Sequence, residues 1–315
     1  MLVRELTRAL VRWMQGVPRE TTMPPATTTT WSNPEPLRRV VLTEGVFRVL
    51  FAEYAAHRES DRGQEEIGWL LLGLRGRDEA IVLATLPAGT NRNASESHVL
   101  FDNKSQELAN WFIRQDRKDL RLLGVVHTHP GSLRHPTSSD YRGDIKWVAN
   151  QWGKEGVFGI GTADAYPTAT GERCQPEPHV LGLGVLRQTW YVLGSKDRNY
   201  RKLPVEVEKG PDLAEPLRKV WAELEAVADR LNPLTELLPK TRLEVAMGRQ
   251  APMIGLTIRH PQGETALHVQ IEGTERRYYL LEKTNGGTSL IPLAPEKPDD
   301  RIDLNILSLL VRLMN

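Results

Sequence analysis

The pattern of apolar and polar positions predicts a globular region of alternating strands and helices over residues 38–200. A nearly continuous apolar run at 67–74 is typical of a strand that is buried on both faces. Apolar residues at helical spacing in 44–58 predict an amphipathic helix, which Thr43 can cap. We therefore expect an α/β or α+β fold. The other expected strands are 40–42, 80–86, 120–127, 157–161, 180–185 and 189–193, and the other expected helices are 106–115 and 139–151.

The pattern changes after Lys209, and residues 205–315 are predicted to form a second, smaller α+β unit. A charged helix is expected at 211–231, and a final helix with one apolar side is expected at 303–314. Between them, hairpin turns at Gln262-Gly263 and Gly273 separate strand candidates. These candidates are 254–260, 266–272 and 277–282. No motif in this unit indicates its role.

Two further segments precede the globular region. Residues 1–15 predict an amphipathic helix, because Leu2, Leu6 and Leu10 recur at helical spacing. Residues 16–37 hold five prolines and a run of threonines, which is typical of a linker or a wrapping arm. The helix has two interpretations: packing on its own domain or on a second copy, as in a homodimer, or docking on a partner or a membrane surface.

Composition excludes several classes of function. Among 315 residues, 40% are hydrophobic, 26% are charged and the net charge is +1, so a packed core is expected and nucleic acid is not expected as a partner. The single cysteine, Cys174, excludes a disulfide framework and a zinc site made of cysteines. No apolar run is long enough to span a membrane, and arginines interrupt the N-terminal apolar stretch. We expect a cytoplasmic protein.

The most informative motif is His127-Thr128-His129-Pro130, followed by Asp140. Two histidines at positions i and i+2 lie on the same face of an extended segment, so both imidazoles can reach one ion. The loop after Pro130 leads to a helix whose first turn holds Asp140. Two nitrogens and one carboxylate form a three-ligand zinc site that leaves the fourth position to water, as a hydrolase requires. His135, in the same loop, would close that position as a fourth ligand and is interpreted as a loop residue.

A hydrolase also needs a group that accepts a proton from water and passes it to the leaving group. Glu65 is the candidate for this general acid/base, because it stands at the head of the buried strand at 67–74. Its neighbour Glu66 would point the other way if the strand is regular.

These residues together resemble the motif of the JAMM (MPN+, JAB domain) metalloprotease family. That motif reads E-x-x-G, then H-[ST]-H-P-x6-S-x-x-D, and it corresponds here to Glu65 to Gly68, His127 to Pro130, and Thr137 to Asp140. The resemblance covers about residues 38–195. It extends to the prokaryotic members of the family, which remove ubiquitin-like modifiers. It implies an MPN/JAB-type mixed sheet sandwiched by helices, and a domain at 38–200.

The resemblance also implies a function for the site. His127, His129 and Asp140 would bind one Zn²⁺ per chain, and Glu65 would activate water for attack on the bond after the C-terminus of a ubiquitin-like protein. Partners would be that modifier or its conjugates, together with enzymes of its conjugation pathway. The family serine, which stabilises the oxyanion, is Thr137 here. A threonine hydroxyl can donate the same bond, and Ser138 is a substitute only if the loop shifts.

Two alternatives remain open at the level of sequence. One is a scaffold in a multiprotein complex that has no catalytic activity and no metal. The other is a metallohydrolase that acts on a small-molecule amide. The sequence does not define the modifier, its targets, or whether the bond is an isopeptide or a linear peptide bond.

Overall fold

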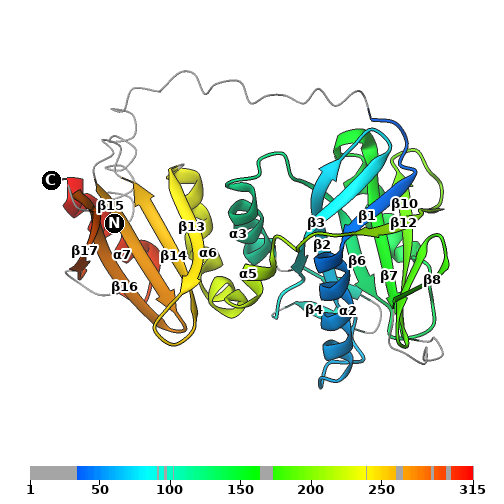
Figure 1. The fold of residues 1–315 in the computed structure, drawn as a ribbon, viewed down its shortest axis with the longest axis horizontal. Helices are drawn as coiled ribbons and strands as arrows, with labels where there is room; N and C mark the ends of the chain where they lie inside the picture. Colours follow the sequence, from blue (N-terminus) through cyan, green and yellow to red (C-terminus); the bar gives the residue numbers. More distant parts are fainter. Residues whose placement is uncertain are drawn as a thin grey trace. The chain divides into compact units, whose positions relative to one another are not determined.

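The computed structural model describes residues 34–90, 92–95, 98–101, 103–163, 173–238, 240–259, 265–284, 287–295 and 299–314. The helix expected at 1–15 and residues 16–33 of the expected linker lie outside these ranges. The described residues divide into two compact units (Figure 1). The larger unit comprises residues 34–106 and 116–215, and the smaller unit comprises residues 107–115 and 216–314.

A mixed sheet organises the larger unit. Its strands are β1 (Arg39–Thr43), β2 (Gly68–Arg75), β3 (Glu79–Pro87), β6 (Arg121–Thr128), β7 (Glu155–Thr162), β8 (Arg173–Glu177), β9 (Val180–Leu183), β10 (Leu186–Gly194), β11 (Arg201–Lys202) and β12 (Val205–Glu208). Their order is β12-β1-β3-β2-β6-β7-β10-β9-β8, and β11 pairs with β10. At the centre, β6 runs parallel to β7 and antiparallel to β2. A small hairpin, β4 (Asn93–Ser95) and β5 (His98–Leu100), follows β3.

Helices cover both faces of this sheet. The helix α2 (Glu44–Arg58) begins at Thr43, whose hydroxyl accepts from the backbone N–H of Val46. Its apolar side chains share a core cluster with Trp69 and Trp190. The other face carries α4 (Ser138–Val148), and the short 3₁₀ helix η1 (Trp152–Lys154) follows it. A second cluster joins Val148 of α4 to Phe158 and Ile160 of β7.

Alternation along the central strands explains why both faces are covered. In β10, Trp190 and Val192 lie in the α2 cluster, whereas Tyr191 and Leu193 lie in the α4 cluster. All nine residues of β10 are buried, as expected for a strand between two layers of helices. In β6, Val126 belongs to the α2 cluster, so its neighbour His127 faces the α4 side. The expected mixed sheet between helices is confirmed.

A buried ion pair joins two strands of the larger unit. Glu155 lies 3.1 Å from Arg75, and the two side chains are only 9% and 3% exposed. The same carboxylate accepts from the backbone N–H of Leu37 at 2.7 Å and from Arg201 at 2.6 Å. It therefore ties the residues before β1 to β7.

Replacing Glu155 with glutamine should lower the free energy of unfolding by about 3–5 kcal/mol, because it leaves the Arg75 charge buried without a counter-charge. Urea unfolding followed by circular dichroism measures the loss. The control is Glu79→Gln, since Glu79 pairs with Arg39 at the surface. Equal stability of the two variants would show that the buried pair adds nothing.

The smaller unit is a five-stranded antiparallel sheet with helices. Its strands follow chain order from β13 to β17. The apolar side chains Leu256 and Val269 pair across adjacent strands and are buried. The strands are β13 (Thr241–Met247), β14 (Pro252–Arg259), β15 (Thr265–Glu272), β16 (Glu275–Thr284) and β17 (Gly287–Leu293), and the helices are α5 (Glu215–Arg218), α6 (Trp221–Leu237) and α7 (Ile302–Met314). The helix α3 (Asn103–Arg114) belongs to this unit from Glu107 onward.

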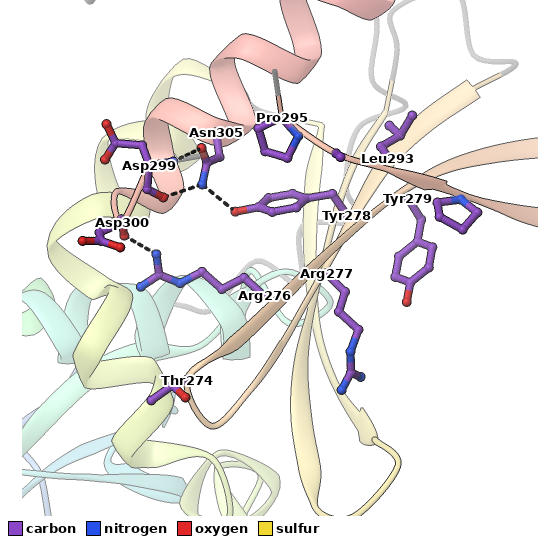
Figure 2. Close-up of a pocket in the computed structure, with 12 residues that line it drawn as sticks. Thr274, Arg276, Arg277, Tyr278, Tyr279, Leu293, Pro295, Asp299, Asp300 and Asn305 are labelled. Carbon is purple, nitrogen blue, oxygen red and sulfur yellow. Dashed lines mark hydrogen bonds between the residues drawn. The ribbon is translucent and has the colours of Figure 1, made fainter. Parts of the chain in front are cut away.

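A surface pocket of about 770 Å³ lies in the smaller unit, beside β16 and the start of α7. Figure 2 shows Tyr278 directed toward Asn305, whose amide donates to the Tyr278 hydroxyl at 3.1 Å and to the carbonyl of Asp299 at 2.7 Å. Tyr279 and Arg277 point away from that pair. The polar groups that meet at Asn305 thus bind one another and fasten α7 to the sheet.

The structure changes the expected domain bounds at two places. Residues 107–115, expected within the domain at 38–200, group with the smaller unit. Residues 205–215 group with the larger unit, because β12 pairs in parallel with β1. The smaller unit therefore begins near residue 216 rather than at 205. It also contains β13 and β17, which the pattern of the sequence did not reveal. No helix in the described part of the chain is long and apolar enough to cross a membrane.

Candidate metal centre

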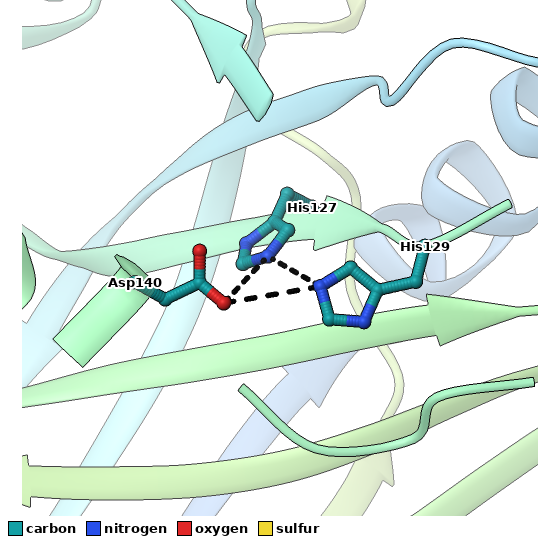
Figure 3. Close-up of side chains that lie close together, drawn as sticks. All are labelled: His127, His129 and Asp140. Atoms are coloured by element: carbon teal, nitrogen blue, oxygen red, sulfur yellow. Dashed lines mark hydrogen bonds and ion pairs between the residues drawn. The ribbon is translucent and has the colours of Figure 1, made fainter. Parts of the chain in front are cut away.

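Three side chains named by the sequence motif converge on the α4 side of the sheet. His127 lies near the end of β6, His129 directly follows the strand, and Asp140 lies in the first turn of α4. Figure 3 shows both imidazoles and the carboxylate directed at one point. Nε2 of His127 lies 3.1 Å from Nε2 of His129. Oδ2 of Asp140 lies 3.7 Å from the first nitrogen and 3.9 Å from the second.

The loop after β6 fixes the orientation of His129. Its Nδ1 lies 2.7 Å from the carbonyl oxygen of Leu133. A carbonyl only accepts, so Nδ1 carries the proton and, in the neutral ring, the lone pair of Nε2 faces Asp140. Metal-binding histidines usually have such a partner on the second nitrogen, because it fixes the tautomer and the ring. His129 is therefore prepared to bind through Nε2.

A capping box holds Asp140. The hydroxyl of Thr137 donates to Oδ2 of Asp140 at 2.8 Å, and the backbone N–H of Thr137 donates to the same oxygen at 2.6 Å. In return, the backbone N–H of Asp140 donates to the Thr137 hydroxyl at 3.2 Å. The start of α4 thus fixes the carboxylate as well as its own first turn.

The three donor atoms suit a zinc ion. Ligand atoms about 2.0–2.1 Å from a tetrahedral zinc lie about 3.3 Å from one another, close to the separations found here. Among the residues that the structure describes, this is the one group of three or more histidine, cysteine or acidic side chains with ligand atoms so near one another. His127 and His129 are buried, so the ion would be largely shielded by protein. Two imidazoles and one carboxylate leave a coordination position open.

The acidic side chain beside the histidines is Glu66. Oε1 of Glu66 lies 3.9 Å from Nε2 of His129, and the residue is 4% exposed. Gly68 pairs with His127 across β2 and β6, and residues two apart share a face of a strand, so Glu66 lies on the face of His127. The candidate for the general acid/base is therefore Glu66.

Glu65, which the sequence indicated for that role, points elsewhere. Its carboxylate forms an ion pair with Arg62 at 2.6 Å, and this partner holds the pKa of Glu65 below its usual value. Arg62 also donates to the backbone carbonyls of Thr90 and Arg92. Glu65 thus belongs to a network that holds the chain leading into β4, and this placement corrects the acid/base assignment.

The pKa values distinguish Glu66, the candidate acid/base, from Asp140, the proposed ligand. Burial raises the pKa of Glu66 to about 7, with a further rise from Asp140 that His127 opposes. Burial would also raise the pKa of Asp140, but the neighbouring His127 and the hydrogen bonds from Thr137 keep it well below its usual range. Asp140 therefore stays ionised as a ligand should, whereas Glu66 can both take up and release a proton near neutrality.

The glycine of the E-x-x-G pattern has a packing reason. A Cβ on Gly68 would lie 2.9 Å from the ring of Phe101 and 3.3 Å from the side chain of Val99. The segment around β5 therefore crosses directly over the start of β2. In addition, the backbone N–H of Glu66 donates to the carbonyl of Ser95 in β4 at 2.8 Å. The small hairpin is thereby fixed beside the candidate acid/base.

The Thr137 hydroxyl, which was predicted to stabilise the oxyanion, donates a hydrogen bond elsewhere in the structure. The Thr137 hydroxyl bonds to Asp140, and Ser138 is an exposed residue in the first turn of α4. We therefore assign Thr137 to the positioning of Asp140, and the oxyanion role of either residue stays a prediction from the family resemblance.

Thr137→Val should weaken zinc binding by about tenfold, the low end of the loss seen when a partner of a metal ligand is removed. Thr137→Ser, which keeps the hydroxyl, should bind zinc as the wild type does. Competition with a chromogenic chelator measures both affinities. Unchanged zinc affinity in Thr137→Val, with a loss of activity, would instead favour the oxyanion role.

Two residues near the site, Asp144 and Tyr200, carry a weak sequence signal or none. Asp144 lies one helical turn after Asp140, and burial raises its pKa to about 6. It accepts from the hydroxyl of Tyr200 at 2.7 Å. An acid four residues after a ligand on a helix is a weak signal for a neighbour of the site. Tyr200 is far from the motif in sequence, and only the fold brings it near.

A mixed sheet between helices, with the two histidines at the end of its central strand, has the architecture of an MPN/JAB-type domain. Residues 47–199, just under half of the chain, match the family described as prokaryotic homologs of the JAB domain, and this match supports a JAB/MPN-type domain over that segment. The family includes metallopeptidases, which often use zinc, and also members that lack activity.

Two further comparisons add little to this assignment. The solution structure of protein DSY2949 from Desulfitobacterium hafniense is similar to this chain with 17% sequence identity and a TM-score of 0.36. The similarity covers 55% of this chain and 94% of that protein. No curated protein matches the chain.

Proposed function

We propose that this protein is a zinc-dependent peptidase or isopeptidase that cleaves the bond after the C-terminus of a ubiquitin-like protein. The observation that carries the proposal is the buried Glu66 carboxylate, which lies 3.9 Å from a nitrogen of the His127, His129 and Asp140 cluster. A scaffold that binds no metal has no need of a buried acid at this place, where desolvation opposes its ionisation.

The residues divide the chemistry among them. Zinc, held by the two imidazoles and Asp140, would act as a Lewis acid on the attacking water and the scissile carbonyl. Glu66 would take the proton from that water as the new carbon–oxygen bond forms. The same carboxyl group would then give the proton to the leaving nitrogen as the carbon–nitrogen bond breaks. Leu133 and Thr137 keep His129 and Asp140 in place throughout.

A peptide substrate is supported by the surroundings of the cluster. Residues 131–135 of the loop after β6 are exposed, including the apolar Leu133, which is 40% exposed. On the other side, the hairpin of β4 and β5 is fixed next to Glu66. An extended C-terminal tail could pair with backbone at such an edge. The ubiquitin-like modifier itself, and enzymes of its conjugation pathway as partners, are inferred from the family.

The experiment uses candidate ubiquitin-like proteins that are joined at their C-terminus to a reporter, in one series by a peptide bond and in another to a lysine side chain. Incubation with zinc should release a product that ends at the last residue of the modifier, as measured by mass spectrometry. A chelator should prevent the release. Zinc binding without cleavage of any fusion would point to a small-molecule amide, and the absence of both would point to a scaffold.

A further inference from the structure

Two tyrosines hold the elements that carry two of the proposed zinc ligands. Tyr191 of β10 is 8% exposed, and its hydroxyl donates to the backbone carbonyl of Arg134 at 2.8 Å. The preceding carbonyl, that of Leu133, accepts from Nδ1 of His129. Tyr191 and His129 thus bind adjacent peptide groups of the same loop. A shift of this loop would turn the His129 ring, so Tyr191 acts on the ligand through the loop.

Tyr200 acts on the other side of the cluster. Its hydroxyl donates to the carboxylate of Asp144 at 2.7 Å. Asp144 and Asp140 are four residues apart on α4, so they lie on the same side of that helix. The bond from Tyr200 therefore fixes the rotation of α4 at the turn next to Asp140. The capping box of Thr137 fixes only the first turn of the helix.

The two tyrosine rings belong to one aromatic cluster. The Tyr191 and Tyr200 rings meet edge to face, with 6.3 Å between centroids and 72° between planes. Tyr200 also packs on Phe158 of β7, with 5.5 Å between ring centroids. Aromatic pairs of this geometry are favourable beyond the area that they bury. The hydroxyls that fix the loop and the helix are thus held at a set separation by the core of the sheet.

We propose that Tyr191 and Tyr200 are positioning residues which set the distance between His129 and Asp140 and thereby the zinc affinity of the site. This inference rests on the proposed zinc site. Neither tyrosine is proposed to touch the ion or the substrate. Their effect is to keep the donor atoms near the separations that a tetrahedral ion requires, so that binding costs little rearrangement.

The test compares Tyr191→Phe, Tyr200→Phe and the double variant, in the full chain, with Tyr278→Phe as the matched control. Tyr278 is a buried tyrosine whose hydroxyl accepts a hydrogen bond from the side chain of Asn305, and it lies in the smaller unit. The zinc dissociation constant, measured by chelator competition, should rise about tenfold in each single variant. The effects of the two single variants should not simply multiply in the double variant, because the two residues are in contact.

A second measurement separates positioning from loss of stability. The visible absorption of bound Co²⁺ reports the geometry of the ligands. It should change in Tyr191→Phe and Tyr200→Phe, and in Asp144→Asn, which weakens the partner of Tyr200, and stay unchanged in Tyr278→Phe. If the tyrosine variants have the same zinc affinities and spectra as the control, the inference about the tyrosines is overturned, but the proposed zinc site is not. A wild-type protein that binds no zinc would overturn both.

Discussion

Replacement of Glu66 by glutamine is expected to lower the rate of cleavage by about 100- to 10,000-fold, the usual contribution of general acid/base catalysis. The side chain keeps its shape and its place beside His129, but it can no longer take up a proton from water. Zinc binding should persist, because Glu66 is not one of the three proposed ligands. Single-turnover rates on a cleavable modifier fusion, with zinc content determined in parallel, measure the effect.

Glu65→Gln is the matched control for this experiment. The substitution makes the same chemical change one residue away, where the carboxylate pairs with Arg62 instead of facing the histidines. Its rate should stay within about tenfold of the wild type, less than the loss expected for a catalytic acid/base. If Glu65→Gln is the inactive variant and Glu66→Gln retains activity, the structural assignment is wrong and the one suggested by the family motif holds.

Loss of a zinc ligand is expected to remove both metal binding and activity. With zinc at about 1,000 times its dissociation constant, the metal should add about 4 kcal/mol to the stability of the wild type. His127→Ala, His129→Ala and Asp140→Asn should show none of this zinc-dependent stabilisation, because two ligands do not hold the ion at that concentration. Thermal unfolding with and without zinc, after removal of metal by a chelator, measures the difference.

His135→Ala controls for a general effect of removing histidine from this region. His135 is exposed in the loop between His129 and Asp140, and it is not part of the proposed ligand set. This variant should bind one zinc and should be stabilised by it as the wild type is. Equal zinc stabilisation in His127→Ala and His135→Ala would mean that the ion binds elsewhere or that no specific site exists.

Much of the larger unit could be predicted from local sequence patterns. The helix at Glu44–Arg58 and its cap at Thr43 agree with the structure residue for residue. The strands with apolar runs were also found, with bounds that differ by one to three residues. These features depend on periodicity and capping, which are local properties. The spacing of the histidine motif likewise indicated the three proposed ligands, which the structure brings within reach of one ion.

The sequence indicated Glu65, whereas the structure places Glu66 beside the histidines, and the reason for this difference is not local. Alternation along an extended segment says only that Glu65 and Glu66 face opposite ways. Which of them faces the histidines depends on the register between β2 and β6, where Gly68 pairs with His127. That register is set by packing across the whole sheet, and a shift of one residue would exchange the two acids.

Other elements were missed for similar reasons. The strand β17 is exposed on most of its residues, so it has no alternating apolar pattern to reveal it. The strand β12 was not predicted, and its residues were placed in the second unit, because it pairs with β1 at residues that are far away in the sequence. The positions of Tyr191 and Tyr200 near the metal centre also depend on long-range packing. Sequence patterns identify candidate metal-binding side chains and secondary-structure elements, whereas the tertiary fold decides which side chains come into contact.

The most direct test of the proposed site is a crystal structure of the zinc-loaded protein with anomalous diffraction recorded at the zinc edge. The proposal predicts one strong peak in the larger unit, within bonding distance of Nε2 of His127, Nε2 of His129 and the carboxylate of Asp140, with the Glu66 carboxyl group facing its open side. A zinc-loaded crystal with no peak among these three side chains, or with Glu66 directed away from it, would contradict the account.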